Sequence, residues 1–350
     1  MSAEQLVERK RPIDTPRYDV IVVGCGGWGL AVLKVLADMG LRVLGIERRE
    51  ICHNLRHYMK RMVMHSRLSY MVLDPDDAIL AQKGETHHPL IEELIQSYSD
   101  FAVKFDLPIK THHELVDIEG SRDNFALTVR DPEDRTVRLA ANRVVLATGS
   151  FDNPNLAGIP GELDAAVHHY FHEWEHIKGK KVLFIGGGFS SADGIIALCQ
   201  RNTILWAVRK SSDEVDQMLT DQKTIWGQPD ARLVNTEIWP ESQVLSLENN
   251  TAVVQTPCGR KSWRYDLCYM LIGHRPNQEL CARLLNGNLA FDDETFESCA
   301  RPGVYLVGAL AKKHLEHIGL TDILCPDNQG IRYIERIRSA MQQEFNCAER

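Results

Sequence analysis

The sequence contains two glycine-rich turns of the kind that bind the phosphates of dinucleotides. The first is Gly24-Cys25-Gly26-Gly27-Trp28-Gly29, between the apolar run 18–23 and an apolar-periodic stretch at 30–39. The second is Gly186-Gly187-Gly188-Phe189-Ser190-Ser191, between the apolar runs 181–185 and 192–200. In each turn the first glycine permits a tight bend, and the second lets backbone N–H groups approach a pyrophosphate. The third position, Gly29 or Ser191, lets the following helix pack closely on the strand and point its N-terminus at the phosphates.

Two such turns in one chain indicate two nucleotides, a flavin in one unit and a nicotinamide in the other. We therefore expect an α/β fold with two Rossmann-like dinucleotide-binding domains, the NADPH-binding domain being inserted in the FAD-binding domain. The Pro- and Gly-bearing linker 151–161 and the end of the strand 267–272 mark the two crossings, and the strand 304–307 returns to the first domain. The expected boundaries are a flexible tail at 1–17, the FAD-binding domain at 18–160 and 271–350, and the NADPH-binding domain at 161–270.

Charged residues at the ends of the second strands indicate which nucleotide each unit binds. Glu47 ends the strand 42–46, where a carboxylate accepts hydrogen bonds from an adenosine ribose diol. Arg209 and Lys210 end the strand 203–208, and two cations suit the 2′-phosphate of NADPH. The alternative for the basic pair is a solvated strand end, and we favour NADPH.

The remaining elements follow from hydrophobic periodicity. The pattern predicts a helix at 89–105 and separate strands at 114–119, 124–130, 136–140 and 143–149. The stretch 48–81 has no clean period and is a candidate for lining a pocket. Within it, His53, His57 and His65 are candidate proton donors near the flavin, although a histidine without a chemical role is equally consistent with each position.

Composition excludes several classes of protein. The net charge of −8 gives no electrostatic footprint for nucleic acid or for an anionic membrane, and no apolar run reaches the ~18 residues of a membrane span. Nine scattered cysteines are typical of reduced intracellular thiols, so we expect a cytoplasmic protein with a small-molecule substrate and leave a homodimer open. His168, His172 and His176 have helical spacing, but no cysteine or carboxylate completes a ligand set, and we expect no metal site.

Taken together, the motifs resemble the two-dinucleotide flavoprotein family of the thioredoxin reductases and, more distantly, the flavin-containing monooxygenases. The resemblance rests on both glycine turns, Ala147-Thr148-Gly149, Gly273-His274-Arg275-Pro276-Asn277 and the run 303–308. It implies that Gly24, Gly26, Gly29 and Glu47 hold the ADP half of FAD, and that the backbone near Val116 passes the adenine. It also implies that Thr148, Gly149 and Gly308 close on the flavin chain and that Gly186, Gly188, Ser190 and Ser191 hold NADPH. Ala309 replaces the acid that the family places after Gly308.

The end of the chain offers one more candidate contact with the flavin. The segment Asn328-Gln329-Gly330 begins a final helix at 331–342. A helix N-terminus aimed at the isoalloxazine, with Gln329 in its first turn, would stabilise the negative charge that forms on reduction by about 0.3–2 kcal/mol. Equally, Gln329 could be an ordinary residue of the first helical turn without a contact to the flavin.

The chain lacks the Cys-x-x-Cys pair by which thioredoxin reductases relay electrons. It is therefore most similar to the subgroup without that pair, such as the bacillithiol-disulfide-reductase-like proteins. Cys25 lies on the first turn, where a thiol could face flavin or phosphate, and a buried inert cysteine is the favoured alternative. We interpret the chain as an FAD- and NADPH-dependent oxidoreductase that oxygenates a small organic substrate with O₂. Reduction of a low-molecular-weight disulfide or another small acceptor, and a catalytically silent nucleotide-binding regulator, are the alternatives.

Overall fold

The first glycine turn connects a buried strand to a buried helix, as its flanking sequence predicts. The structure, a computed structural model, describes residues 15–311 and 330–348. Strand β1 (Arg17–Val23) has four buried residues at its end, and helix α1 (Gly27–Asp38) begins within the turn itself. Strand β2 (Val43–Ile46) then returns parallel to β1 and is buried throughout. These elements form the strand–turn–helix–strand unit that a dinucleotide-binding turn requires.

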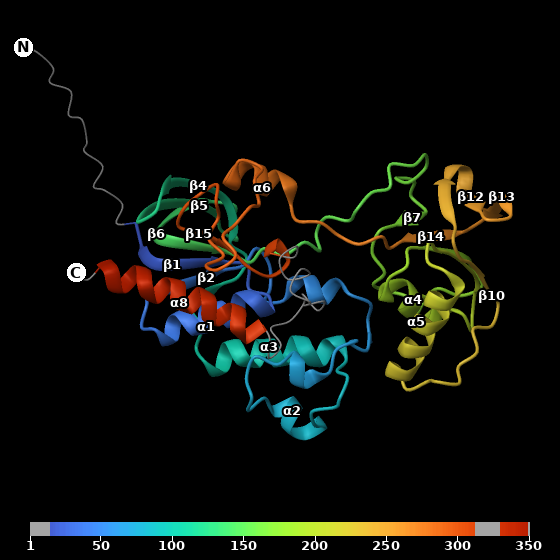
Figure 1. The fold of residues 1–350 in the computed structure, drawn as a ribbon, viewed down its shortest axis with the longest axis horizontal. Coiled ribbons are helices and arrows are strands. Elements are labelled where there is room, and N and C mark those ends of the chain that lie inside the picture. The colour runs from blue at the N-terminus through green and yellow to red at the C-terminus, as the bar shows by residue number, and fades with distance from the viewer. Residues whose placement is uncertain (1–14, 312–329, 349–350) are drawn as a thin grey trace, which may run out of the picture.

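A first sheet is built around this unit, with the strand order β3-β2-β1-β6-β5-β4 and with β15 paired to β6. Its other strands are β3 (Ile109–Lys110), β4 (Glu114–Ser121), β5 (Asn124–Arg130), β6 (Thr136–Leu146) and β15 (Val304–Leu306). Helices α1 and α8 (Gly330–Ala348) lie beside one another on this sheet (Figure 1). Helix α3 (Ile91–Lys104) packs near α1, and α6 (Gln278–Leu285) contacts β4.

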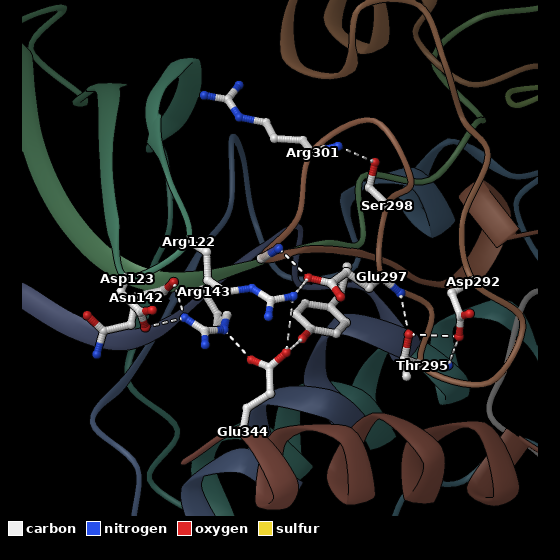
Figure 2. A network of polar contacts seen from close by, with 12 residues as sticks. Arg122, Asp123, Asn142, Arg143, Asp292, Thr295, Glu297, Ser298, Arg301 and Glu344 are labelled. Atoms are coloured by element: carbon white, nitrogen blue, oxygen red, sulfur yellow. Dashed lines mark hydrogen bonds and ion pairs between the residues drawn. The ribbon is translucent and has the colours of Figure 1, made fainter. Parts of the chain in front are cut away.

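Strand β6 corrects the prediction of two separate strands at 136–140 and 143–149. It is one continuous strand that pairs with β5 at its start and with β1 and β15 at its end. The polar residues Asn142 and Arg143 do not interrupt it, because their side chains find partners. Arg143 is buried and pairs with Asp123 and with Glu344 of α8, as Figure 2 shows. This network ties the last helix to the sheet.

A second lobe contains the other glycine turn. Five strands form a parallel sheet in the order β10-β9-β8-β14-β7: β7 (Val167–His168), β8 (Lys181–Ile185), β9 (Thr203–Ala207), β10 (Thr236–Trp239) and β14 (Leu267–Met270). Helices α4 (Phe189–Leu198) and α5 (Ser212–Ile225) pack together on it. A small antiparallel sheet consists of β11 (Gln243–Ser246), β12 (Thr251–Thr256) and β13 (Gly259–Arg264). The expected α/β fold with two dinucleotide-binding units is confirmed.

The chain passes between the lobes twice, and the two passages run side by side (Figure 1). The backbone N–H of Asn155 donates to the carbonyl of Gly273 at 2.9 Å, and that of Arg275 donates to the carbonyl of Asn153 at 2.8 Å. The passages therefore form a short hydrogen-bonded ribbon. The domain boundaries given above stay a prediction.

The irregular stretch after β2 also joins the two lobes, through contacts rather than as a third passage of the chain. It contains short helices at His53–His57 (η1), Leu68–Tyr70 (η2) and Ala78–Lys83 (α2). Met59 is 3% exposed and belongs to the apolar core of the second lobe. The backbone N–H of Lys60 donates to the carbonyl of His172 at 3.1 Å, and the Trp174 indole donates to the carbonyl of Lys60 at 3.0 Å. The stretch is thus a docked arm between the lobes.

Among the helices of residues 15–311 and 330–348, none has the length and hydropathy that a membrane span needs.

Candidate functional site

A cleft of about 560 Å³ opens at the first glycine turn. Gly24 has φ +95°, and a Cβ there would lie 2.5 Å from the carbonyl oxygen of Ala147, so only glycine fits this bend. A Cβ on Gly26 would meet nothing within 4 Å, which leaves its backbone open to a ligand. Gly29 lies against Gly24, where any Cβ would overlap the Gly24 carbonyl. The turn therefore has the shape that the pyrophosphate of FAD requires.

Glu47 lines the same cleft at the end of β2. Its carboxylate accepts a hydrogen bond from the backbone N–H of Cys25 at 2.8 Å and another from that of Arg49 at 3.0 Å. A carboxylate has about four acceptor positions, so two backbone bonds leave capacity for a ribose diol. The carboxylate acceptor at this end of the cleft thus suits the ribose hydroxyl groups of an adenosine.

The structure brings most of the other predicted FAD residues to this cleft. Thr148, Gly149 and Gly308 line it, as does Ala309, and the Trp28 ring packs against Gly308. Val116 is the extra residue at a β-bulge in β4, directly after the lining residues His113, Glu114 and Leu115. A bulged residue is left out of the strand pairing, so its backbone groups are available to a ligand. Gln329 lies outside the described residues.

A second cleft, of about 600 Å³, opens at the second glycine turn. Gly186 has φ +124°, and a Cβ there would collide with the carbonyl of Leu271, whereas a Cβ on Gly188 would meet nothing within 4 Å. The cleft is lined by Gly188 and Ser190, but Ser191 is fully buried beneath it. This turn repeats the geometry of the first, with a tight bend followed by open backbone at the start of α4.

Arg209 and Lys210 lie beside the second turn rather than in the second cleft. Arg209 is exposed, and the alkyl chain of Lys210 lies next to the place where a Cβ on Gly187 would be. Within residues 15–311 and 330–348 no ion pair engages either side chain. Both cations are therefore available to a phosphate that reaches past the turn.

The two clefts share one wall. Tyr58, Phe151, Gly273 and His274 line both. The Phe151 ring centroid lies 4.6 Å from that of Tyr58 and 4.4 Å from that of His274, and the Tyr170 hydroxyl donates to the carbonyl of Phe151 at 3.0 Å. These residues come from the docked arm and from both passages between the lobes. Ligands in the two clefts would thus meet at this aromatic wall.

Asp193 and Gln222 also line the second cleft, and sequence reasoning missed both. The Asp193 carboxylate is 2% exposed and accepts hydrogen bonds from Gln222 Nε2 at 2.6 Å and from Trp226 Nε1 at 2.9 Å. Burial raises the pKa of Asp193 to about 7, against the lowering effect of these two bonds. The signal in the sequence was an acid inside the apolar helical stretch after the second turn.

The three histidines proposed as proton donors do not all line the same cleft. His53 lines the first cleft, while His57 and His65 line the second. The Nε2 atoms of His53 and His57 are 2.8 Å apart, and the His53 Nδ1 lies 3.2 Å from the Glu50 carboxylate. Burial and the nearby His53 lower the pKa of His57. His65 stacks on Phe189 with a ring-centroid distance of 4.2 Å.

The two cysteines at the first cleft, Cys25 and Cys52, are both buried. Cys25 is fully buried, and burial, followed by the charge of Glu47, raises the pKa of its thiol well above the usual value. Cys52 is 2% exposed, and its sulfur lies 3.9 Å from the carbonyl oxygen of Cys25. A thiol held in its protonated form is a poor nucleophile.

The spacing of His168, His172 and His176 does not place them on a helix. His168 ends β7, and the following residues form no helix. His172 instead contacts the carbonyl of Tyr58 through Nδ1 at 2.6 Å. In the part of the chain that the structure describes, no group of three potential ligands could hold a metal ion.

Comparison with known proteins agrees with this geometry. The family model of the pyridine nucleotide-disulphide oxidoreductases matches residues 21–308. The chain belongs to this family. It is an oxidoreductase, and FAD and NADPH are the cofactors of the family, as the two turns predicted.

The relatives of known name differ in how much of their length they share with the chain. Bacilliredoxin reductase Bdr of Bacillus subtilis is 23% identical over 83% of this chain and 89% of its own. Oxidative stress-induced growth inhibitor 1 of the mouse is 28% identical over 58% of this chain, and the match spans 52% of the mouse protein. The solved bacillithiol disulfide reductase Bdr from Bacillus cereus has a TM-score of 0.77 with 19% identity, covering 94% of this chain and 99% of that one. The solved structure therefore shows that the chain has the fold of these two-domain reductases.

Proposed function

We propose that this protein transfers electrons from NADPH through FAD to a small-molecule acceptor. The first cleft would hold FAD through its glycine turn and Glu47, and the second turn would hold NADPH with Arg209 and Lys210 at the 2′-phosphate. When bound, FAD accepts a hydride from NADPH and passes the electrons on. The observation that carries this proposal is the wall of Tyr58, Phe151, Gly273 and His274 that both clefts share.

Our first candidate for the second half-reaction is oxygenation of a small organic substrate with O₂. A thiol relay of the thioredoxin-reductase kind is disfavoured because the sequence has no Cys-x-x-Cys pair and Cys25 is buried. The flavin is then the evident redox centre. The second cleft is lined by Met59, Met62 and Met64 together with aromatic side chains, which gives an apolar surface for the body of an organic substrate.

The second candidate is direct reduction of a low-molecular-weight disulfide, which the likeness to the bacilliredoxin reductase over 83% of the chain supports. A catalytically silent nucleotide-binding protein is the third, with Ala309 in place of an acid as its support. We place the protein in the cytoplasm as part of this proposal and leave its assembly open.

Rapid mixing of the FAD-loaded protein with NADPH under nitrogen tests the first half-reaction, since bleaching of the flavin absorbance reports electron transfer. Reoxidation is then followed after adding O₂, with and without a substrate, or a small disulfide such as glutathione disulfide. Fast reoxidation by O₂ that a substrate accelerates supports the oxygenase. Reoxidation that is slow in air and fast with the disulfide supports the reductase, and absence of bleaching supports the silent protein.

A further inference from the structure

Buried polar atoms without hydrogen-bond partners gather around the second cleft. In the described part of the chain four residues have such atoms, and three of them, His169, Gln222 and His274, line this cleft. Both ring nitrogens of His169 and the Nε2 of His274 are unpartnered. Native proteins pair nearly all buried polar atoms, so a cluster of exceptions on one cavity marks polar positions for a bound ligand or for water that a ligand replaces.

The two histidines are neighbours because of the strand order. His169 directly follows β7, and His274 lies four residues beyond the end of β14. These strands are adjacent and parallel, with His168 opposite Tyr269. The ends of adjacent parallel strands open onto the same edge of a sheet, where α/β proteins bind ligands. Burial lowers the pKa of His274, and the nearby His169 lowers it further.

Gln222 and His169 belong to different parts of the cleft wall. The Gln222 side chain comes from α5 and is fixed by its bond to Asp193 of α4. The histidines come from the strand ends, and His274 also lines the first cleft. We assign the α4 and α5 side of the cleft to NADPH, in line with the proposed function. The histidine side is then available to the second substrate.

The lining chemistry restricts the charge of that substrate. On the histidine side of the second cleft no lysine or arginine is among the described lining residues, so a carboxylate or phosphate of the second substrate would find no cation there. A neutral imidazole offers one N–H donor and one lone pair in either tautomer. A hydroxyl group, which donates one hydrogen bond and accepts another, can satisfy one nitrogen of each histidine. The rings of Tyr170 and Phe171 and the methionines suit an aromatic body.

We propose that the second cleft binds an uncharged phenol, whose hydroxyl group is held between His169 and His274. This inference rests on the proposed function, since it names the class of the organic substrate. It also assigns binding roles to two histidines outside the candidates that the sequence suggested.

Three probes with the same body and different heads test the proposal by titration calorimetry on the FAD-loaded protein without NADPH. They are 4-ethylphenol, which is uncharged at pH 7, 4-ethylbenzoate, an anion, and 4-ethylbenzylamine, a cation. We expect 4-ethylphenol to bind most tightly and 4-ethylbenzoate at least tenfold more weakly. Tightest binding by the anion or the cation, or no binding of the phenol, overturns the proposal.

Variants that keep the ring and remove the nitrogens separate binding from folding. His169→Phe and His274→Phe should each weaken binding of 4-ethylphenol about fivefold to tenfold, the loss of one hydrogen bond. Because both His169 nitrogens and the His274 Nε2 have no partners among the described residues, and phenylalanine keeps the ring, neither variant should lower the melting temperature of the loaded protein. His168→Phe, one residue away and outside the cleft, is the matched control and should bind the phenol as the wild type does.

Flavin bleaching and phenol binding, measured on the same samples, distinguish a failure of this inference from a failure of the proposed function. If NADPH bleaches the flavin and the phenol binds equally to wild type and His169→Phe, only the assignment of the histidines is wrong. If the phenol binds as expected and NADPH does not bleach the flavin, the proposed function fails and the binding site stands.

Discussion

The carboxylate of Glu47 accepts a hydrogen bond of 2.8 Å from the backbone N–H of Cys25, which ties the end of β2 to the first glycine turn. The same side chain accepts the backbone N–H of Arg49 at 3.0 Å. Glu47 therefore holds the turn in shape and faces the cleft at the same time. Loss of this side chain would affect both the protein and the nucleotide.

Replacing Glu47 with alanine should weaken FAD binding by about 1.5–3 kcal/mol, the value of a charge-assisted hydrogen bond, or about tenfold to a hundredfold in Kd. Fluorescence titration of the deflavinated protein with FAD measures this. Glu119→Ala, an exposed acid on the same sheet, should bind FAD normally. Equal retention of FAD by Glu47→Ala and Glu119→Ala would remove Glu47 from the site.

Replacing Arg209 and Lys210 together with glutamine should raise the KM for NADPH at least tenfold and leave that for NADH within about twofold. The physical reason is that only NADPH carries the 2′-phosphate, which charge-assisted hydrogen bonds would hold. Initial rates of flavin reduction with each coenzyme provide the measurement. Arg260→Gln, an exposed cation elsewhere on the second lobe, is the control. Similar changes for both coenzymes would show that the pair is surface charge.

Cys25→Ala should keep the rate of NADPH-dependent flavin bleaching within about twofold, because hydride transfer needs no thiol and burial raises the pKa of this one, which disfavours its thiolate. Cys25→Ser should behave similarly once folded, although its buried hydroxyl needs a partner. Cys268→Ala, equally buried in the second lobe, controls for the small cavity. Disulfide-dependent reoxidation that disappears only in the Cys25 variants would establish a single-cysteine reductase instead.

Asp193 should make the stability of the protein depend on pH. Its pKa is raised to about 7 in the folded state, so the folded protein holds a proton that the unfolded chain releases near its ordinary value of 3.8. Stability contributed by the protonated group is therefore present at low pH and is lost as the pH rises from about 4 to about 7. Asp193→Asn should match the wild type near pH 4 and exceed it above pH 7 in denaturant unfolding. A difference independent of pH would contradict the raised pKa.

Several features of this protein could be predicted from its sequence because they depend on residues that are close together in the chain. Both glycine turns were found because their function depends on the backbone conformation of a few consecutive residues, such as Gly24 and Gly186. Glu47 was found because its distance along the chain from the first turn is set by one helix and one strand. The single strand β6 was missed because Asn142, between the two predicted strands, looks unfavourable in a strand until its partners Arg17 and Asp19 are seen.

The sequence by itself determined the α/β fold, the two nucleotide turns and the family, since each depends on short segments with a strong backbone preference. Only the tertiary structure decided which side chains face the second cleft. His169 and His274 are more than a hundred residues apart in the sequence and become neighbours because β7 and β14 pair in one sheet. Met59 likewise enters the core of the other lobe through the docked arm. Such contacts depend on strand order and on the docking of the lobes, which no local pattern of residues specifies.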